Sequence, residues 1–173
     1  MKKQEIIISR DLAGSLAQAL DRQSYDRLFV LTDTTTHRLC RPLLSGMKGM
    51  DDARDIVIEP TDEHKDLHSL ASVWTALQEG GATRHSLMIN LGGGMVTDLG
   101  GFAASTFKRG IPYINIPTTL LSMVDASVGG KTGINYGGLK NEIGVFCPAR
   151  TVILSSRFLA SLDSRNLCSG YAE

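Results

Sequence analysis

The sequence predicts an α/β fold, a Rossmann-like parallel sheet with helices on both faces. Two observations support this prediction. Six short apolar runs alternate with segments of helical periodicity along the 173 residues, as expected for buried parallel strands joined by helices. Glycine pairs and triplets gather in the second half, which indicates tight turns or close approach of a ligand. The length suits one domain, 1–173.

The expected strands are apolar nearly throughout, and several are rich in β-branched residues. They are Glu5–Ser9, Arg27–Thr32, Asp55–Glu59, Ser86–Leu91, Pro112–Ile116 and Thr151–Ser155. The clearest helix between them is Asp66–Gln78, and Gly80-Gly81 ends it. A second helix is expected over Met95–Ser105. The apolar face of the first helix comprises Leu67, Leu70, Ala71, Trp74 and Leu77.

The charge balance and the cysteines narrow the class of protein. Lys and Arg number 18, as do Asp and Glu, so no electrostatic reason exists to expect nucleic acid or a membrane surface as a partner. No apolar stretch approaches the roughly 18 residues that span a bilayer. Cys40, Cys147 and Cys168 are widely spaced and form no CxxC pair, so we expect reduced thiols and a cytoplasmic location.

A glycine turn follows the expected strand Ser86–Leu91. Gly92–Gly94 leads from this strand into a helix, and the amino end of a helix after such a turn favours phosphate. The dinucleotide pattern GxGxxG fails because Thr97 holds the third glycine position. A tight turn without a ligand is the alternative. Asp98, one helical turn later, is either an acceptor for a ribose or substrate hydroxyl or a surface aspartate.

Other polar positions suggest a local anion site. Asp33 ends an expected strand, where a carboxylate either contacts a ribose or caps the next helix. Ser127–Thr132 resembles the tail of a Walker A loop, but Asp125 stands where its first glycine belongs, so an ATPase is not expected. Basic residues adjoin three glycine turns, which suggests a local anion site, with solvated lysines as the alternative for each one. They are Lys108-Arg109, Lys131 and Lys140.

Together these segments resemble the 3-dehydroquinate synthase family. The resemblance is carried by Leu91–Ile111, Ile116–Asn135, Leu139–Gly144 and Ser169–Glu173. It implies an amino-terminal nucleotide-binding α/β domain followed by a helical metal-binding domain. It also implies a phosphate lyase of the shikimate pathway, which uses NAD and a divalent metal, zinc or cobalt. The implied reaction converts the sugar-acid phosphate DAHP into 3-dehydroquinate with loss of phosphate, in a homodimer of the full-length protein.

The resemblance assigns roles position by position. Asp125, Lys131 and Asn141 match substrate-facing residues, and Arg109 matches an arginine that reaches the substrate phosphate from the neighbouring subunit. Glu173 matches the first metal ligand. Alignment on Lys65 puts Asp62 where the family has glutamate, with Glu63 as the alternative. The matches to NAD contacts are Asp33, Thr34, Thr35, Asp62, Lys65, Gly93, Gly94, Met95, Asp98, Thr118, Thr119, Lys140, Phe158, Leu159, Ala160 and Ser161.

The resemblance also leads us to expect a fragment. The family's two histidine metal ligands lie in the helical domain, which this chain lacks, so turnover by these residues alone is not expected. Other cyclases, of the 2-deoxy-scyllo-inosose or valiolone type, and polyol dehydrogenases are alternatives, although Lys140-Asn141 favours 3-dehydroquinate formation. A non-catalytic nucleotide-binding or dimerisation module is the third hypothesis. The intact set of Asp125, Lys131 and Asn141 argues against it.

Overall fold

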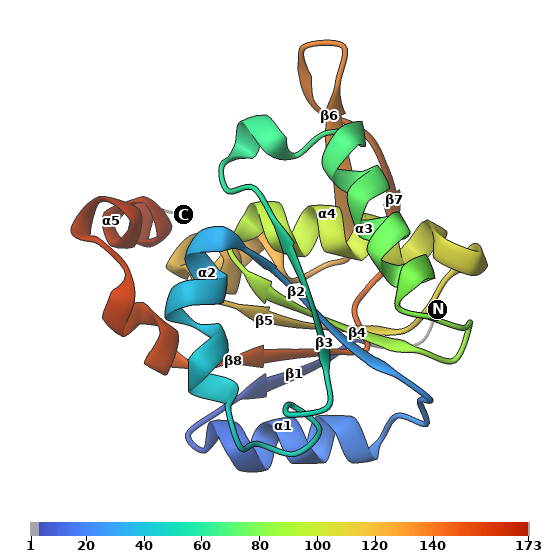
Figure 1. The fold of residues 1–173 in the computed structure, drawn as a ribbon. Helices are drawn as coiled ribbons and strands as arrows, with labels where there is room; N and C mark the ends of the chain where they lie inside the picture. Colours follow the sequence, from blue (N-terminus) through green and yellow to red (C-terminus); the bar gives the residue numbers. More distant parts are fainter. Residues whose placement is uncertain (1–3, 173) are drawn as a thin grey trace.

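The computed structural model describes residues 4–172 and contains a six-stranded parallel sheet (Figure 1). The strand order is β1-β8-β5-β4-β2-β3. All six expected strands are therefore confirmed, with ends that differ by at most one residue. Their bounds are β1 Glu5–Ile8, β2 Leu28–Asp33, β3 Arg54–Ile58, β4 Leu87–Gly92, β5 Tyr113–Pro117 and β8 Thr151–Leu154.

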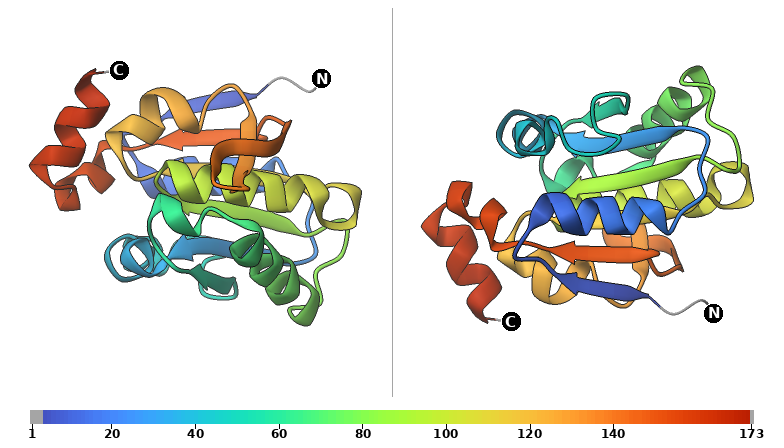
Figure 2. Two further views of the ribbon diagram at one scale, coloured as in Figure 1. Left: turned by 90° about the horizontal axis from the view of Figure 1, so that it is seen from above. Right: turned by 90° about the horizontal axis from the view of Figure 1, so that it is seen from below.

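Helices cover both faces of the sheet, as the fold class requires (Figure 2). Helix α1 lies on one face, and α3 and α4 lie on the other. The helices are α1 Leu12–Asp21, α2 Thr34–Leu39, α3 Leu67–Glu79, α4 Gly94–Thr106 and α5 Ser164–Ala172. None of the helices in residues 4–172 has the length and apolar character needed to cross a membrane.

The core forms two layers because side chains of a strand alternate between the faces of the sheet. On β2, Phe29 and Leu31 pack towards α3 and α4, whereas Leu28 and Val30 pack towards α1. All four side chains are buried. Burial of each stabilises the fold by about 1.5–3 kcal/mol, which explains why both faces of this strand are apolar.

Helix α3 begins one residue later than expected, and its buried face agrees with the expected one at Leu70 and Leu77 but not at every position. Asp66 is its N-cap, and its carboxylate accepts a hydrogen bond from the Ser69 amide at 2.8 Å. Val73 is fully buried, whereas Leu67 is 51% exposed. The expected face was therefore wrong at Leu67 and Ala71, which are exposed. The buried stripe runs along positions spaced by three and four residues, namely Leu70, Val73 and Leu77.

An antiparallel hairpin was not predicted. It consists of β6 Lys131–Tyr136 and β7 Leu139–Phe146 and projects beyond the sheet (Figure 1). The hairpin lies against α4, where a Cβ on Gly101 would stand 2.4 Å from Cγ2 of Thr132. Glycine at position 101 thus permits the close approach of helix and hairpin.

The strand order places a crevice at the carboxyl ends of β2 and β4. The chain leaves β2 for the edge strand β3, whereas it leaves β4 in the opposite direction for β5. Because these two connections diverge, the ends of β2 and β4 form a topological switch point. Ligands of open α/β sheets bind at such points.

Candidate functional site

The glycine turn lies at the switch point. Gly93 is the N-cap of α4 and carries no side chain that could satisfy the first amides of the helix. A Cβ on Gly93 would stand 3.2 Å from Cγ2 of Thr119, and one on Gly94 would stand 3.3 Å from Cβ of Ala126. The turn is therefore packed closely against the segment after β5. Its amides and the helix dipole favour an anion at this place.

Thr118 and Thr119 differ in how their hydroxyls are engaged. The Thr118 amide donates to the Gly92 carbonyl at 2.9 Å, which ties this residue to the glycine turn. Its hydroxyl is buried and has no hydrogen-bond partner among the described residues. The Thr119 hydroxyl instead lies 2.9 Å from that of Ser122. Since buried polar groups are normally paired, the Thr118 hydroxyl is a group that a ligand or water could satisfy.

Asp33 ends β2 on the other side of the crevice. Its carboxylate accepts a hydrogen bond from the Thr36 amide at 2.8 Å, and the Thr36 hydroxyl lies 3.1 Å from the Asp33 amide in return. This capping box confirms the helix-cap interpretation of Asp33. Its Oδ2 makes no hydrogen bond to the described residues. Thr34 and Thr35 follow in the first turn of α2 and are exposed.

A buried lysine joins three elements beside the turn. The side chain of Lys65 is only 6% exposed, and its Nζ lies 3.2 Å from Oδ2 of Asp98 on α4. The same Nζ lies 3.4 Å from Oδ1 of Asp62 and donates a hydrogen bond to Oδ1 of Asn141 on β7. Lys140 pairs with the other oxygen of Asp62 at 2.8 Å. Five of the residues expected at the site are thus brought together.

The two carboxylates of this network have opposite pKa shifts. Burial raises the pKa of Asp98, and the nearby Lys65 only partly offsets it. The hydrogen bond from Lys140 lowers the pKa of Asp62, with Lys65 adding to the same effect. Pairs of carboxylates whose surroundings separate their pKa values are typical of sites that move protons.

A hollow of about 660 Å³ opens between α4 and the hairpin. Four residues predicted at the site line it, namely Asp98, Asp125, Lys131 and Asn141. Its size is within the range of roughly 300–1,000 Å³ of small-molecule sites. Glu142, which was not anticipated as a site residue, lines the same hollow.

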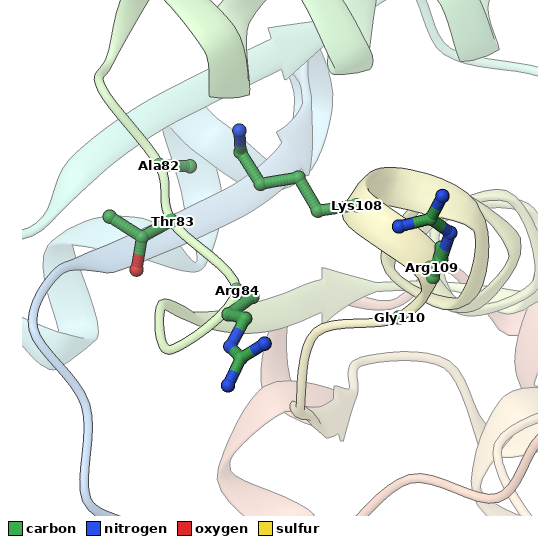
Figure 3. A pocket seen from close by; sticks show the side chains of 6 residues that line it. All are labelled: Ala82, Thr83, Arg84, Lys108, Arg109 and Gly110. Carbon is green, nitrogen blue, oxygen red and sulfur yellow. The ribbon is translucent and has the colours of Figure 1, made fainter.

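Arg109 lies away from this hollow. Together with Arg84 and Lys108 it lines a separate hollow next to the amino-terminal end of β5 (Figure 3). Lys140 lines yet another, at the outer half of the hairpin. Within one chain, the structure does not bring Arg109, Lys131 and Lys140 together as a single anion site.

The remaining predicted positions divide into core and surface. Met95 is half-buried beside the turn. Phe158 is fully buried among the side chains on the α1 side of the sheet, so core packing alone accounts for a phenylalanine at this position. Leu159 is half-buried, whereas Ala160 and Ser161 are exposed. Glu173 lies outside the described residues. Within residues 4–172, no group of three or more His, Cys, Asp or Glu could hold a metal ion.

Asn135 on β6 is a polar residue of the site region that was not singled out. Its side chain contacts both the Asp62 carbonyl, at 2.8 Å, and the Asn141 amide, at 3.0 Å. Asparagine is depleted in strands, and this was the one signal in the sequence that could have indicated its role.

The fold is that of the α/β domain found in sugar-phosphate cyclases. The structure matches that of 2-epi-5-epi-valiolone synthase from Streptomyces hygroscopicus, which has NAD⁺ and Zn²⁺ bound, with a TM-score of 0.87 and 34% identity over 99% of this chain and 48% of that one. A 2-deoxy-scyllo-inosose synthase shares the fold, with a TM-score of 0.84 and 22% identity over 96% of this chain and 46% of that one.

Sequence comparison gives the particular family. Residues 55–169 match the family model of the 3-dehydroquinate synthase N-terminal domain, and the chain belongs to this family. It is 52% identical over 173 residues to the 3-dehydroquinate synthase of Parabacteroides distasonis, covering all of this chain and 49% of the relative. It is 40% identical over 151 residues to that of Clostridium tetani, covering 87% of this chain and 40% of the relative. The chain thus spans about half the length of the relatives that it matches, or less.

Proposed function

We propose that this chain forms the NAD-binding α/β part of an enzyme that converts DAHP into 3-dehydroquinate and phosphate. The observation that carries the proposal is the position of Lys65, which joins Asp98 and Asn141 at the hollow beside the glycine turn. The relatives are named 3-dehydroquinate synthases, which supports 3-dehydroquinate as the product. Catalysis by the full-length protein, in the cytoplasm and as a homodimer, is part of the same proposal.

The residues at the switch point fit NAD. Gly93, Gly94 and Met95 offer backbone amides to a pyrophosphate, and Thr118 offers a buried hydroxyl that lacks a partner in the described chain. Across the crevice, Asp33 keeps one carboxylate oxygen for a ribose hydroxyl. NAD would supply reversible hydride transfer. Further proposed contacts are Thr34, Thr35, Asp62, Lys65, Asp98, Thr119, Lys140 and the segment Phe158–Ser161.

The hollow supplies groups that hold an anionic substrate and move protons. Lys131 is exposed at its wall and provides a positive charge. Asp98, on α4, and Asp125, in the turn after β5, provide carboxylates to the same hollow. A carboxylate whose pKa is raised by burial, as in Asp98, holds a proton more readily than an exposed aspartate and is suited to accept and return one. Asn141 orients the substrate through its amide group.

The described residues do not by themselves fit the divalent metal of the proposed enzyme, because they contain no suitable group of three ligands. We propose Glu173 as one ligand, and we expect the 173 residues alone to show no turnover.

Arg109 is proposed to act on the substrate phosphate of a second subunit. Its distance from the hollow of its own chain supports this role, because Arg109 lines a separate hollow with Arg84 and Lys108 (Figure 3). Arginine suits phosphate because it can bind two oxygens at once.

A related cyclase activity is the second candidate. The structural match to 2-epi-5-epi-valiolone synthase at 34% identity favours it. A non-catalytic binding module is less favoured, since Asp125, Lys131 and Asn141 line one hollow and such a module needs no substrate groups.

The test uses the full-length protein with NAD and zinc, and compares DAHP, sedoheptulose 7-phosphate and glucose 6-phosphate as substrates. We expect release of phosphate and formation of 3-dehydroquinate from DAHP alone. Turnover of sedoheptulose 7-phosphate in its place would assign the valiolone-type activity. NAD binding without turnover of any of the three would overturn the proposed reaction.

A further inference from the structure

The hairpin has a bulge at the place where it meets the site. Ile134 pairs with Ile143, whereas Tyr136 pairs with Leu139. Only Asn135 lies between the two pairs on β6, whereas residues 140–142 lie between them on β7. A single residue therefore faces three. Bulges of this kind interrupt the ladder and redirect side chains, and they occur often beside functional sites.

Asn135 makes three hydrogen bonds, of which two tie the bulge to the segment before α3 and one lies within the hairpin. Its amide donates to the Lys65 carbonyl at 2.7 Å, and its Nδ2 donates to the Asp62 carbonyl at 2.8 Å. Its Oδ1 accepts from the Asn141 amide at 3.0 Å. The orientation of the side-chain amide follows from these partners, because a carbonyl only accepts and a backbone N–H only donates.

The partner of Asn135 has an unusual backbone conformation. Asn141 has φ = +55°, in the left-handed region, which few residues other than glycine adopt and which asparagine adopts more readily than most. Such a conformation persists where surrounding contacts determine it. The bulge removes the Asn141 amide from the ladder, and Oδ1 of Asn135 supplies the missing acceptor. The Asn141 side chain is thereby free to accept from Nζ of the buried Lys65.

We propose that Asn135 is a positioning residue of the site. It holds the bulge against the segment from Asp62 to Lys65, so that Asn141 and Lys65 stay together at the wall of the hollow. Asn135 is not among the residues that line the hollow with Asp98, so it acts through Asn141. This role rests on the proposed function, which makes Asn141 a substrate contact.

The inner half of the hairpin has anchors of its own. Ile134 is 1% exposed and belongs to the core, and Thr132 packs on Gly101. Loss of the Asn135 side chain should therefore release residues 137–142 and leave the sheet and α4 in place. This separates a positioning role from a general structural one.

The test compares Asn135→Ala, Asn135→Asp and the control Tyr136→Ala in the full-length protein. Tyr136 is the next residue on the same strand and is 56% exposed, so its removal changes the hairpin without breaking these bonds. We expect kcat/KM for DAHP to fall about 10- to 100-fold in Asn135→Ala, mainly through KM, with an unchanged melting temperature. Asn135→Asp keeps the acceptor for the Asn141 amide, so its kcat/KM should be about tenfold higher than that of Asn135→Ala.

Hydrogen exchange of the Asn141 amide gives a readout that does not depend on catalysis. Exchange should be faster in Asn135→Ala than in Asn135→Asp or Tyr136→Ala. Equal exchange in the three variants overturns the proposal, as does a loss of kcat/KM in Asn135→Ala that Asn135→Asp does not reduce. If the unmodified protein does not turn over DAHP, the proposed function fails, and the exchange data still decide whether Asn135 positions Asn141.

Discussion

Nζ of Lys65 lies 3.2 Å from Oδ2 of Asp98, and both side chains are withdrawn from solvent. The lysine precedes α3 and the aspartate lies in the second turn of α4, so the contact connects two elements that are far apart in sequence. Burial raises the pKa of Asp98 in spite of this cation. The desolvation of the carboxylate therefore outweighs the attraction of a single lysine.

Substitution of Lys65 by Met should leave the carboxylate of Asp98 without its positively charged partner. Removal of one partner of a buried pair leaves the other uncompensated, which destabilises proteins by about 3–5 kcal/mol when both are fully buried. Asp98 retains 21% side-chain exposure, so we expect a smaller loss of about 1–3 kcal/mol in the free energy of unfolding. Urea denaturation of the full-length protein measures it.

The double variant Lys65→Met, Asp98→Asn is the control for that experiment. It should recover at least half of the lost stability, because no unpaired charge remains. Equal stability of the single and double variants would show that the loss comes from packing of the lysine stem and not from the ion pair.

The pH dependence of stability should change sign between two single variants. Asp98 has a raised pKa in the fold, so the folded state binds the proton more tightly and this group lowers stability as pH rises from about 3.9 through the folded value. Asp62 has a lowered pKa, so its contribution is present above about 3.9 and is lost as pH falls through the folded value.

Urea denaturation at a series of pH values from 3 to 7 tests this difference. Relative to the unmodified protein, Asp98→Asn should gain stability as pH rises, whereas Asp62→Asn should lose it. The comparison uses only the slope of the free energy of unfolding against pH, since each variant also alters the contacts of Lys65 and so shifts the absolute values. Parallel slopes for the two variants would contradict the opposite shifts.

The sheet could be predicted because its strands carry their signal locally. Met88 and Ile89 on β4 are both fully buried although they face opposite sides, and such continuous apolar runs are typical of strands covered on both faces. The crevice depends on the order of the strands in the sheet, and no local sequence pattern indicates that order. The crevice exists because β4 lies beside β2 in the sheet.

The hairpin could not be predicted, because its second strand has no buried side. Every residue of β7 is exposed, so no alternation of apolar and polar residues marks it. Contacts between residues distant in sequence hold the hairpin in place. Thr132 packs against Gly101, and the Asn135 side chain donates a hydrogen bond to the Asp62 carbonyl. For the same reason Lys131, Lys140 and Asn141 were identified through glycine turns and family resemblance, and not through a strand pattern.

Substitution of Gly101 by Ala should displace the hairpin. The added Cβ would stand 2.4 Å from Cγ2 and 3.2 Å from Cβ of Thr132, so β6 must shift. We expect a loss of about 1–3 kcal/mol in the free energy of unfolding and a weaker affinity for substrate. The companion substitution Thr132→Ser removes the methyl group and should restore part of both, and no recovery would show that the clash lies elsewhere.

Substitution of Thr118 by Val tests the proposed NAD site both in the NAD-free protein and in the NAD complex. The hydroxyl is buried and lacks a partner in the described chain, so replacement by a methyl group of similar size should leave the stability of the NAD-free protein unchanged or slightly raise it. If the hydroxyl bonds to NAD, the dissociation constant for NAD should rise about 5- to 20-fold, as expected for one lost hydrogen bond of about 1–2 kcal/mol. Calorimetric titration and thermal unfolding measure the two effects.

Thr118→Ser separates the hydroxyl from the rest of the side chain. It keeps the oxygen and removes the methyl group, so NAD affinity should stay near that of the unmodified protein while the melting temperature falls slightly. The combination expected for Thr118→Val, unchanged stability with weaker NAD binding, arises only if the partner of the hydroxyl is the cofactor. A loss of stability in the NAD-free Thr118→Val protein would instead indicate that an internal water already satisfies this group.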